Sequence, residues 1–539
     1  MSEHTLRETA YGTIQGTSEG EVQIWYGVPY GKAPTGDLRW KAPEAPDAWD
    51  GIRDASSPGE SAMQLAAGRV TGTEDCLKLD IYSRKGTEKR PVLVFIHGGN
   101  NQNGTSLELS GTELVSDGSM VFVSLEYRLG LPGFFTLPVF AKEKSYSGNF
   151  TLQDFARALD WIHENIEAFG GDPDNITLSG FSAGGRDVMA ALISPLFRGK
   201  FQRAIAFSGG MTVAEPVMSM KKIAEYLAPL AVRDGKADTE AGAVSWLLSE
   251  KEEVKSYLNA LPSAELCGLV GGANIRMAVF PHLFTDGVTL PQDGFDTEIY
   301  NQVPVMMVTG TTEFKGFADG DAYLNSSAMD DYTEEERSAA FIFAAKYGSR
   351  MYRYFNADAS AEQMAERFTA PIYLCDINHG KEDSESPNPV SGAFHGVFLP
   401  LLSSEHRKAG NAPEGFWEET SYLELASMFQ QYLKNFVSTG NPNEAWTAVC
   451  QNCTQNFLSL QQWNQWNKET KLSLVLDVKK AADTDHKKAL AENRKYQDSY
   501  SAIMADMKKD ASVSEELKDK IVRNVLNGRW FSAELDKNW

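Results

Sequence analysis

The sequence predicts an α/β protein in which helices flank a central, twisted and mostly parallel sheet, with helical insertions between its strands. Short, continuous apolar runs recur along the chain, and strands buried on both faces of a parallel sheet have this character. The runs are residues 91–96 (PVLVFI), 120–125 (MVFVSL), 176–179 (ITLS), 204–208 (AIAFS), 303–309 (VPVMMVT) and 371–376 (PIYLCD). Between the second and third runs, apolar residues recur every three or four positions from Leu152 to Phe169, as on one face of a helix. This alternation predicts parallel strands joined by right-handed crossovers.

Most of the chain is predicted to form one domain. Residues 1–478 carry the alternation of strand and helix, and residues 479–539 form a charged, helical extension that we expect to pack on the same domain with one face. The segment from about residue 210 to 290 is longer than a crossover needs and is partly helical. It is either a cap over a substrate site or a set of ordinary packing helices, and the sequence leaves both interpretations open.

Composition excludes several classes of partner. The 539 residues carry a formal net charge of −22 and no basic stripe, so nucleic acid and anionic membranes would repel the chain. Residues 1–10 (MSEHTLRETA) lack the apolar core of an export signal, and no apolar run is long enough to span a bilayer. The odd number of cysteines, five, suits free thiols in a reducing compartment, so we expect a cytoplasmic protein.

One pair of cysteines has the spacing of a metal or redox motif. Cys450 and Cys453 form a lone C-x-x-C, without a second pair or a nearby histidine. We therefore interpret the pair as part of a surface loop and expect no metal site.

Two stretches match the pattern G-x-S-x-G, which marks the nucleophile turn of some serine hydrolases. Residues 16–20 (GTSEG) lie between two short alternating runs, which predicts a hairpin with Ser18 in its turn. Residues 180–184 (GFSAG) follow the strand-like run ITLS and precede a helical pattern. A reactive serine needs this strand–turn–helix context, because the turn exposes its hydroxyl above the sheet. We therefore assign Ser182 as the nucleophile.

A serine hydroxyl also needs a base and an acid that orients the base, and in this arrangement the chain order is Ser, acid, His. Glu313 follows the predicted strand 303–309, where the acid should lie, and Asp319 and Asp321 are deeper in the same loop. His395 lies in a small-residue and aromatic setting, SGAFHGVFLP, that could enclose a ring. His379, the alternative base, lies among charged residues. Spacing favours His395 as the base but does not exclude His379.

The reaction also needs main-chain N–H donors for the oxyanion. One is the residue after the nucleophile, Ala183, and others come from a glycine-rich turn after an early strand. Residues 97–100 (HGGN) supply that turn directly after the strand 91–96. Glycine permits left-handed backbone there, and asparagine tolerates it better than most residues.

With these motifs in this order, the chain resembles the type-B carboxylesterase family, which includes cholinesterases and bacterial para-nitrobenzyl esterases. The resemblance covers roughly residues 10–475. Its motifs are residues 28–43 (VPYGKAPTGDLRWKAP), 74–82 (EDCLKLDIY), 97–100, 126–135 (EYRLGLPGFF), 148–185, 310–314 (GTTEF), 392–396 (GAFHG) and 436–443 (FVSTGNPN).

The resemblance implies an α/β-hydrolase fold and hydrolysis of small-molecule carboxylic esters through an acyl-enzyme, without a metal or organic cofactor. It assigns Ser182 as nucleophile, Glu313 as acid and His395 as base. It assigns the oxyanion hole to the N–H groups of Gly99, Asn100 and Ala183.

The chain departs from the family pattern at several positions near these residues. Asn100 stands where the family usually has a third glycine, and Phe181 and Phe398 stand where it has carboxylates. We hypothesise that the two phenylalanines changed together and pack in a less anionic pocket that selects against cationic esters. Arg186 and Asp187 replace residues that are usually small or hydroxylic. Asp187 suits a helix N-terminus, and Arg186 suits a structural ion pair better than binding of a substrate carboxylate.

A disulfide common in the family is also missing. Secreted members usually pair a cysteine matching Cys76 with an earlier one, and this chain has no earlier cysteine. This departure fits a cytoplasmic enzyme.

Two other functions are compatible with the same motifs. An amidase or thioesterase would use the same triad, because the choice of leaving group depends on the shape of the pocket. Some cholinesterase-like domains are non-catalytic interaction modules that have lost triad residues, but all three are present here.

Overall fold

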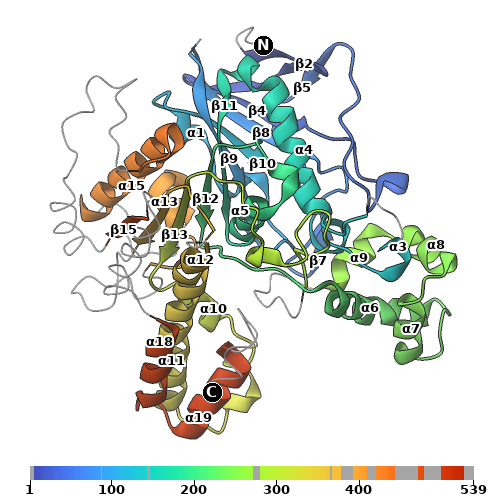
Figure 1. Cartoon of the computed structure of the whole chain (residues 1–539), viewed down its shortest axis with the longest axis vertical. Coiled ribbons are helices and arrows are strands. Elements are labelled where there is room, and N and C mark those ends of the chain that lie inside the picture. The colour runs from blue at the N-terminus through green and yellow to red at the C-terminus, as the bar shows by residue number, and fades with distance from the viewer. Residues whose placement is uncertain are drawn as a thin grey trace. The chain divides into compact units, whose positions relative to one another are not determined.

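A computed structural model gives the fold of the chain (Figure 1). It describes residues 5–86, 88–141, 146–270, 280–364, 367–377, 393–409, 420–442, 472–478 and 499–526. The chain divides into two compact units. The first consists of Met1–Ala204 and Thr212–Asn301, and the second of Ile205–Met211 and Gln302–Trp539.

The first unit contains a mixed sheet. Its strands are, in spatial order, β3 (Thr17–Glu19), β4 (Val22–Pro29), β8 (Lys78–Arg84), β10 (Val121–Leu125), β9 (Arg90–Ile96) and β11 (Gly171–Phe181). The predicted strands β10, β9 and β11 run parallel, whereas β3, β4, β8 and β10 pair in antiparallel fashion. Ser18 lies in the β3–β4 hairpin opposite Gln23, and the turn at Gly20 has a φ of 59°. The predicted hairpin is therefore present, but Ser18 belongs to strand β3 and not to the turn, so the turn position predicted for Ser18 is wrong.

The helix between β10 and β11 follows the apolar pattern of the sequence. Helix α4 (Phe150–Asn165) buries Leu152, Phe155, Leu159 and Ile162, and the 3-10 turn η4 (Ile166–Phe169) continues it. Gly170, with a φ of 82°, ends this turn and directs the chain into β11. The helix thereby brings the chain back to the sheet at the strand that ends before Ser182.

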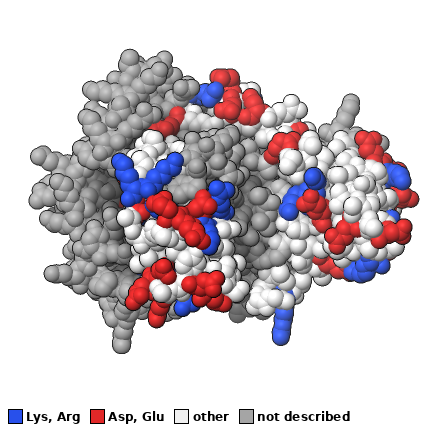
Figure 2. Space-filling model, turned by 90° about the horizontal axis from the view of Figure 1, so that it is seen from below, with Lys and Arg blue, Asp and Glu red and all other residues white. Residues whose placement is uncertain are grey.

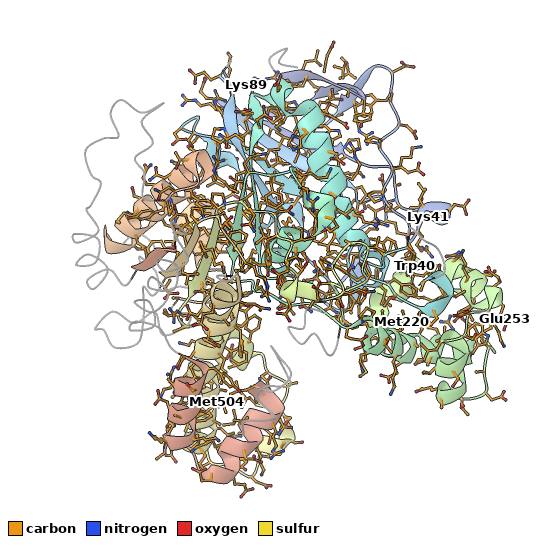
Figure 3. The ribbon with its side chains drawn as sticks, viewed as in Figure 1. Trp40, Lys41, Lys89, Met220, Glu253 and Met504 are labelled. Carbon is orange, nitrogen blue, oxygen red and sulfur yellow. The ribbon has the colours of Figure 1, made fainter. Side chains whose placement is uncertain are left out.

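The segment between β12 (Arg203–Phe207) and residue 290 is largely helical where the structure describes it. Its helices are α6 (Pro216–Arg233), α7 (Glu240–Leu247), α8 (Glu252–Ala260) and α9 (Ser263–Leu269). They lie together in the first unit (Figure 1). On α8, Glu253 accepts a hydrogen bond from the Trp246 indole at 2.8 Å (Figure 3).

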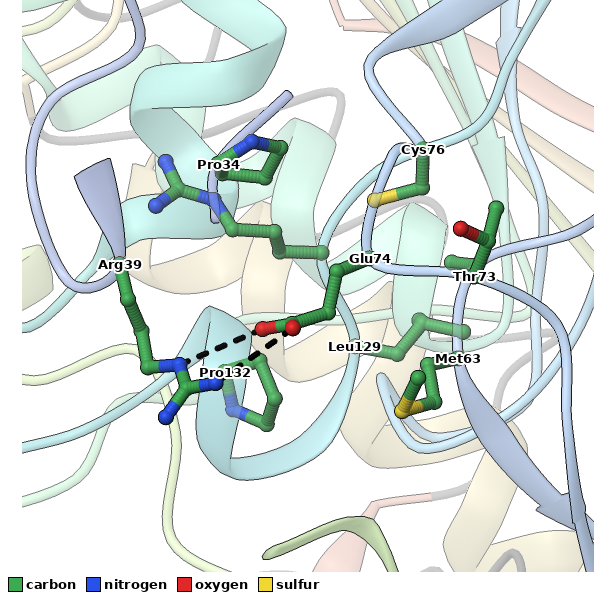
Figure 4. A pocket seen from close by; sticks show the side chains of 10 residues that line it. Pro34, Arg39, Met63, Thr73, Glu74, Cys76, Leu129 and Pro132 are labelled. Atoms are coloured by element: carbon green, nitrogen blue, oxygen red, sulfur yellow. Dashed lines mark hydrogen bonds and ion pairs between the residues drawn. The ribbon is translucent and has the colours of Figure 1, made fainter. Parts of the chain in front are cut away.

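Arg39 fastens this helical segment to the strand-bearing part of the first unit. Its guanidinium donates to the Leu261 carbonyl and to Ser263 Oγ, both at 2.6 Å, and pairs with Glu74 at 3.3 Å (Figure 4). Met63 and Cys76 line the adjoining cavity, whose volume of about 10 Å³ holds roughly one water. Arg39 therefore holds the start of α9 against this part of the first unit. Both interpretations of the segment, a substrate cap and ordinary packing helices, stay predictions.

The second unit contains the later strands. β13 (Val305–Gly310) and β14 (Ile372–Ile377) run parallel, with Met307 opposite Leu374, and β15 (Leu472–Val478) pairs antiparallel with β14. β12 begins in the first unit and ends in the second. The predicted strands 303–309 and 371–376 are thus confirmed.

The described part of the C-terminal region packs against one long helix of the second unit. Helices α18 (Tyr500–Lys509) and α19 (Glu515–Ile521) contact α11 (Glu334–Arg353) (Figure 1). The Tyr347 hydroxyl donates to Asp510 at 2.8 Å, and Met504 is buried on α18 (Figure 3). Residues 479–498 lie outside the described residues, so the boundary predicted at residue 478 stays a prediction.

The surface and the thiols bear on possible partners. On the face that Figure 2 shows, acidic and basic side chains are interspersed, without a broad basic patch among the residues drawn in colour. Within the described ranges, the helices are too short or too polar to cross a membrane. Cys76, Cys267 and Cys375 are buried free thiols, whereas Cys450 and Cys453 lie outside the described residues.

Candidate active site

Ser182 occupies a sharp turn between a strand and a helix. β11 ends at Phe181, and α5 (Ala183–Ile193) begins directly after Ser182. Ser182 has a φ of 56° and a ψ of −111°, a conformation that residues with a side chain rarely adopt. Such strain persists only where the surrounding packing imposes it, and it is typical of nucleophile turns. The strand–turn–helix context predicted for residues 180–184 is therefore present.

Close packing explains both glycines of this turn. A Cβ atom on Gly180 would lie 2.2 Å from the Gly184 carbonyl oxygen, and one on Gly184 would lie 2.3 Å from the Ile96 carbonyl oxygen. No side chain fits at either distance, so the start of α5 can press against the ends of β11 and β9 only with glycine at both positions.

The glycine-rich turn after β9 is held by main-chain and carboxylate contacts. The Gly98 N–H donates to Glu108 Oε2 at 2.7 Å, and the N–H groups of Gln102 and Asn103 donate to the Gly99 carbonyl at 3.0 and 3.1 Å. Gly99 has a φ of 100°, and a Cβ atom there would lie 1.9 Å from the Asn103 carbonyl oxygen. Because the Gly98 N–H is bound to a carboxylate, the next N–H groups along the turn, those of Gly99 and Asn100, are the candidate oxyanion donors.

Two consecutive asparagines in this turn contact the N-terminal half of α5. Asn100 and Asn101 have φ values of 54° and 56°. Arg186 Nη1 donates to Asn100 Oδ1, and Asn101 Nδ2 donates to Asp187 Oδ1, each at 3.0 Å. The sequence favoured a structural ion pair for Arg186 and a helix N-terminus for Asp187. Asp187 is the fifth residue of α5, and the first turn of the helix holds no acidic residue, so the N-terminal position expected for Asp187 is wrong. Asp187 is fully buried, and burial raises its pKa to about 7.

The second unit brings Glu313 and His395 together. His395 Nδ1 lies 2.8 Å from Glu313 Oε2, the geometry of an imidazole N–H donating to a carboxylate. Glu313 is fully buried, and its Oε1 accepts hydrogen bonds from Ser208 Oγ and from the Gly310 N–H, both at 2.6 Å. Both carboxylate oxygens are therefore engaged, and one of them fixes the imidazole.

The chain around these two residues explains how they meet. The Thr312 N–H donates to the Ala393 carbonyl at 3.1 Å, and a Cβ atom on Gly310 would lie 2.2 Å from that same oxygen. The segment that carries His395 therefore crosses close to the end of β13. The imidazole packs against the rings of Phe317 and Tyr352, at centroid distances of 4.9 and 5.4 Å, and keeps 16% of its side-chain surface exposed.

Ser208 is a supporting residue that the sequence analysis missed. It follows β12, has a φ of 53° and donates its N–H to the Val308 carbonyl at 2.7 Å. Its signal in the sequence is a hydroxyl at the end of the run AIAFS, where it is indistinguishable from a last strand residue. Position at the carboxyl end of a sheet strand is the one clue that could have found it.

The aromatic residues near the predicted site have partners of their own. Phe398 begins helix α13 (Phe398–Leu402) and stacks on Phe207, with centroids 4.1 Å apart and planes within 11°. Phe181 is buried beside Gly98, on which a Cβ atom would lie 2.9 Å from the Phe181 ring. Phe181 and Phe398 belong to different units, and their packing together stays a prediction.

The structure therefore assembles the predicted site in two groups. Ser182, Ala183, Gly99 and Asn100 belong to the first unit, and Glu313 and His395 belong to the second. The alternative acids are occupied differently, because Asp319 is exposed and Asp321 caps the N–H groups of Tyr323 and Leu324. The alternative base, His379, lies outside the described residues. Within the described ranges, no three His, Cys, Asp or Glu side chains are grouped so that they could hold a metal ion.

Comparison with known proteins identifies the relatives of this chain. The sequence profile of the Carboxylesterase family matches residues 3–353. The para-nitrobenzyl esterase of Bacillus subtilis (strain 168) is 30% identical over 510 residues, which cover 89% of this chain and 96% of that protein. Liver carboxylesterase 1 of Oryctolagus cuniculus is 31% identical over 497 residues, covering 81% and 86% of the two chains.

Solved structures agree with this relationship. The structure of a thermophilic para-nitrobenzyl esterase superposes with a TM-score of 0.64 at 28% identity, covering 83% of this chain and 93% of that one. The α/β-hydrolase fold expected from the sequence is thereby confirmed.

Proposed function

Because the chain belongs to the carboxylesterase family and is a carboxylic-ester hydrolase, we propose that Ser182, His395 and Glu313 form its catalytic triad. The observation that carries this proposal is the bond of 2.8 Å between His395 Nδ1 and Glu313 Oε2, supported by Ser208. It orients the one remaining imidazole nitrogen, Nε2, as the base. The strained turn at Ser182 supports the nucleophile.

The proposed reaction proceeds through an acyl-enzyme. Ser182 Oγ attacks the ester carbonyl carbon while His395 Nε2 takes the hydroxyl proton. His395 then gives this proton to the leaving alcohol oxygen, and the bond between that oxygen and the acyl carbon breaks. In the second half, His395 Nε2 takes a proton from water while the water oxygen attacks the acyl carbon. His395 then gives this proton to Ser182 Oγ as the bond between Oγ and the acyl carbon breaks, which releases the acid and restores the Ser182 hydroxyl. Glu313 keeps the imidazole in the tautomer that has Nε2 free to accept.

The N–H groups of Gly99, Asn100 and Ala183 are the proposed oxyanion hole. They lie on the turn after β9 and on the first residue of α5, and the Gly98 N–H is bound by Glu108 instead. Loss of one such donor typically raises the barrier by about 2.7–4 kcal/mol. The substrate pocket is proposed to include Phe181 and Phe398, whose apolar rings favour a neutral ester.

The proposed location is the cytoplasm. Cys76, Cys267 and Cys375 are buried and free, which suits a reducing compartment, and the net charge of −22 disfavours nucleic acid as a partner. Labelling of thiols in freshly lysed cells under denaturing conditions tests this, since cytoplasmic protein should react at all five cysteines.

A direct experiment tests the triad. Wild-type enzyme should hydrolyse a short para-nitrophenyl ester and react with a covalent serine probe, and Ser182→Ala should lose both. Ser18→Ala is the matched control in the other G-x-S-x-G stretch and should keep both. Turnover in Ser182→Ala, or loss in Ser18→Ala, would refute the assignment. Matched ester, amide and thioester substrates in the same assay define the preferred leaving group.

A further inference from the structure

The turn that carries two of the proposed oxyanion donors has an unusual backbone. Asn100 and Asn101 are consecutive non-glycine residues in the left-handed region, with φ values of 54° and 56°. Asparagine tolerates this region better than other residues, but a single residue is the usual extent. The second residue's carbonyl accepts the Gly130 N–H at 2.7 Å. A turn of this shape therefore needs contacts from outside it to stay in place.

Arg186 supplies one of these contacts. Its Nη1 donates to Asn100 Oδ1 at 3.0 Å, and the two side chains are buried, with 5% and 3% of their surfaces exposed. The amide nitrogen of Asn100 in turn donates to Gln102 Oε1 at 3.0 Å, and Gln102 donates to the Val270 carbonyl at 2.8 Å. Hydrogen bonds thus hold the Asn100 side chain at both its oxygen and its nitrogen.

Asp187 supplies the other contact. Its Oδ1 accepts from Asn101 Nδ2 at 3.0 Å, and both residues are fully buried. Arg186 and Asp187 are the fourth and fifth residues of α5, and Asn100 and Asn101 are likewise adjacent in the turn after β9. The two bonds therefore run side by side between the same two short segments.

These segments are the two sources of the oxyanion donors. α5 begins with Ala183, and the turn after β9 carries Gly99 and Asn100. Stabilisation of an oxyanion depends on donors held at fixed positions before the charge develops, and a small displacement weakens every bond to it.

We propose that Arg186 and Asp187 are positioning residues that lock the Asn100–Asn101 turn to α5, and so set the geometry of the oxyanion hole. The inference rests on the proposed function of that hole. Because the oxyanion exists only in the transition state and the intermediates, loosening the lock lowers kcat and leaves KM nearly unchanged. An Arg186 that bound a substrate carboxylate would instead change KM, and only for anionic esters.

A double-mutant cycle tests the first contact. Arg186→Met removes the donor and keeps the length of the side chain, and Asn100→Gly removes the acceptor while its backbone takes a φ of 54° without strain. On a neutral para-nitrophenyl ester, Arg186→Met should lower kcat about 10- to 100-fold with KM within about threefold. In the Asn100→Gly background the same substitution should change kcat less than about threefold, because the contact it breaks is already gone.

The second contact allows rescue by a conservative change. Asp187→Ala, which removes the acceptor, should lower kcat about tenfold, whereas Asp187→Asn keeps an acceptor oxygen and should recover most of that loss. Binding of a trifluoromethyl ketone, which forms an oxyanion-bearing adduct with the serine, should weaken in parallel with kcat/KM across all variants. Thermal melting of each variant separates a loosened turn from a protein that has unfolded, and Arg186→Leu, which also lacks a donor, replaces Arg186→Met if the latter does not fold.

The outcomes separate this inference from the function on which it rests. Independent, multiplicative effects of Arg186→Met and Asn100→Gly, or an effect confined to the KM of anionic esters, would overturn the lock and leave the esterase mechanism standing. Ester hydrolysis that survives Ser182→Ala would instead refute the proposed site.

Discussion

Ser208 Oγ donates a hydrogen bond of 2.6 Å to Glu313 Oε1, on the carboxylate whose other oxygen holds His395. The serine is itself fixed, because its N–H donates to the Val308 carbonyl and its carbonyl accepts from the Tyr352 hydroxyl at 3.2 Å. The Glu313 carboxylate is thus oriented by Ser208, at the end of β12, as well as by the Gly310 N–H, at the end of β13.

Ser208→Ala tests this support. A hydrogen bond to a charged group contributes about 1.5–3 kcal/mol, so thermal stability should fall. We expect kcat to fall about tenfold, since a less constrained imidazole loses part of a general-base contribution of about 10²–10⁴-fold. Ser194→Ala is the matched control, because Ser194 is also buried but donates to the Thr289 carbonyl at 2.7 Å. Equal effects of the two substitutions on kcat would contradict the role of Ser208.

Glu313→Gln tests the orienting acid. The amide keeps the size of the carboxylate but can present its N–H₂ to the imidazole, which favours the wrong tautomer. A loss in kcat of the order of 10³–10⁴-fold is expected, with the fold retained. Asp319→Asn, at the exposed acid of the same loop, should leave kcat unchanged. If Asp319→Asn were the damaging variant, the acid would be misassigned.

Sequence alone was sufficient to locate those candidate residues that directly follow a strand. The turn at Ser182, the glycine-rich turn at residues 97–100 and Glu313 each follow a strand that its own apolar run predicts. Such runs report burial on both faces of a sheet, so the strand ends, and the residues just past them, can be located without knowing the fold.

The remaining features depend on pairs of residues that are distant in the chain. Arg186 contacts Asn100 across 86 positions, and Ser208 contacts Glu313 across 105. Single residues of these types are common in any sequence, and their meaning depends on tertiary packing. Strand β8 was missed for a related reason: it pairs antiparallel with β4 near one side of the sheet, where continuous apolar character is not required.

The aromatic residues near the site predict selectivity between charged and neutral esters. With Phe181 and Phe398 in place of carboxylates, a quaternary-ammonium ester gains no counter-charge and loses hydration on binding. We expect kcat/KM for a choline ester to be at least about tenfold lower than for its neutral 3,3-dimethylbutyl isostere.

Two variants isolate the charge from the packing. Phe398→Glu should narrow the difference between the two esters, whereas Phe398→Gln, which loses the same stacking on Phe207 at 4.1 Å, should not. Comparable efficiency of the wild-type enzyme on both esters would remove the basis for this selectivity.

The buried Asp187 predicts a pH-dependent stability that a neutral replacement lacks. Burial raises the pKa of Asp187 from 3.8 to about 7, so the folded state favours the protonated carboxyl. The stability linked to this group is fully present below about pH 4 and is lost as the pH rises through about 7. At about 1.36 kcal/mol per pKa unit, the loss of folding stability approaches about 4 kcal/mol at high pH as an upper bound.

Asp187→Asn keeps the acceptor for Asn101 and does not titrate. Its Tm relative to wild type should therefore rise between pH 4 and pH 7 and level off above, as thermal melts at intervals of half a pH unit would show. The difference between the two proteins cancels the titration of all other groups, so a Tm difference that stays constant across this range would show that Asp187 is ionised throughout.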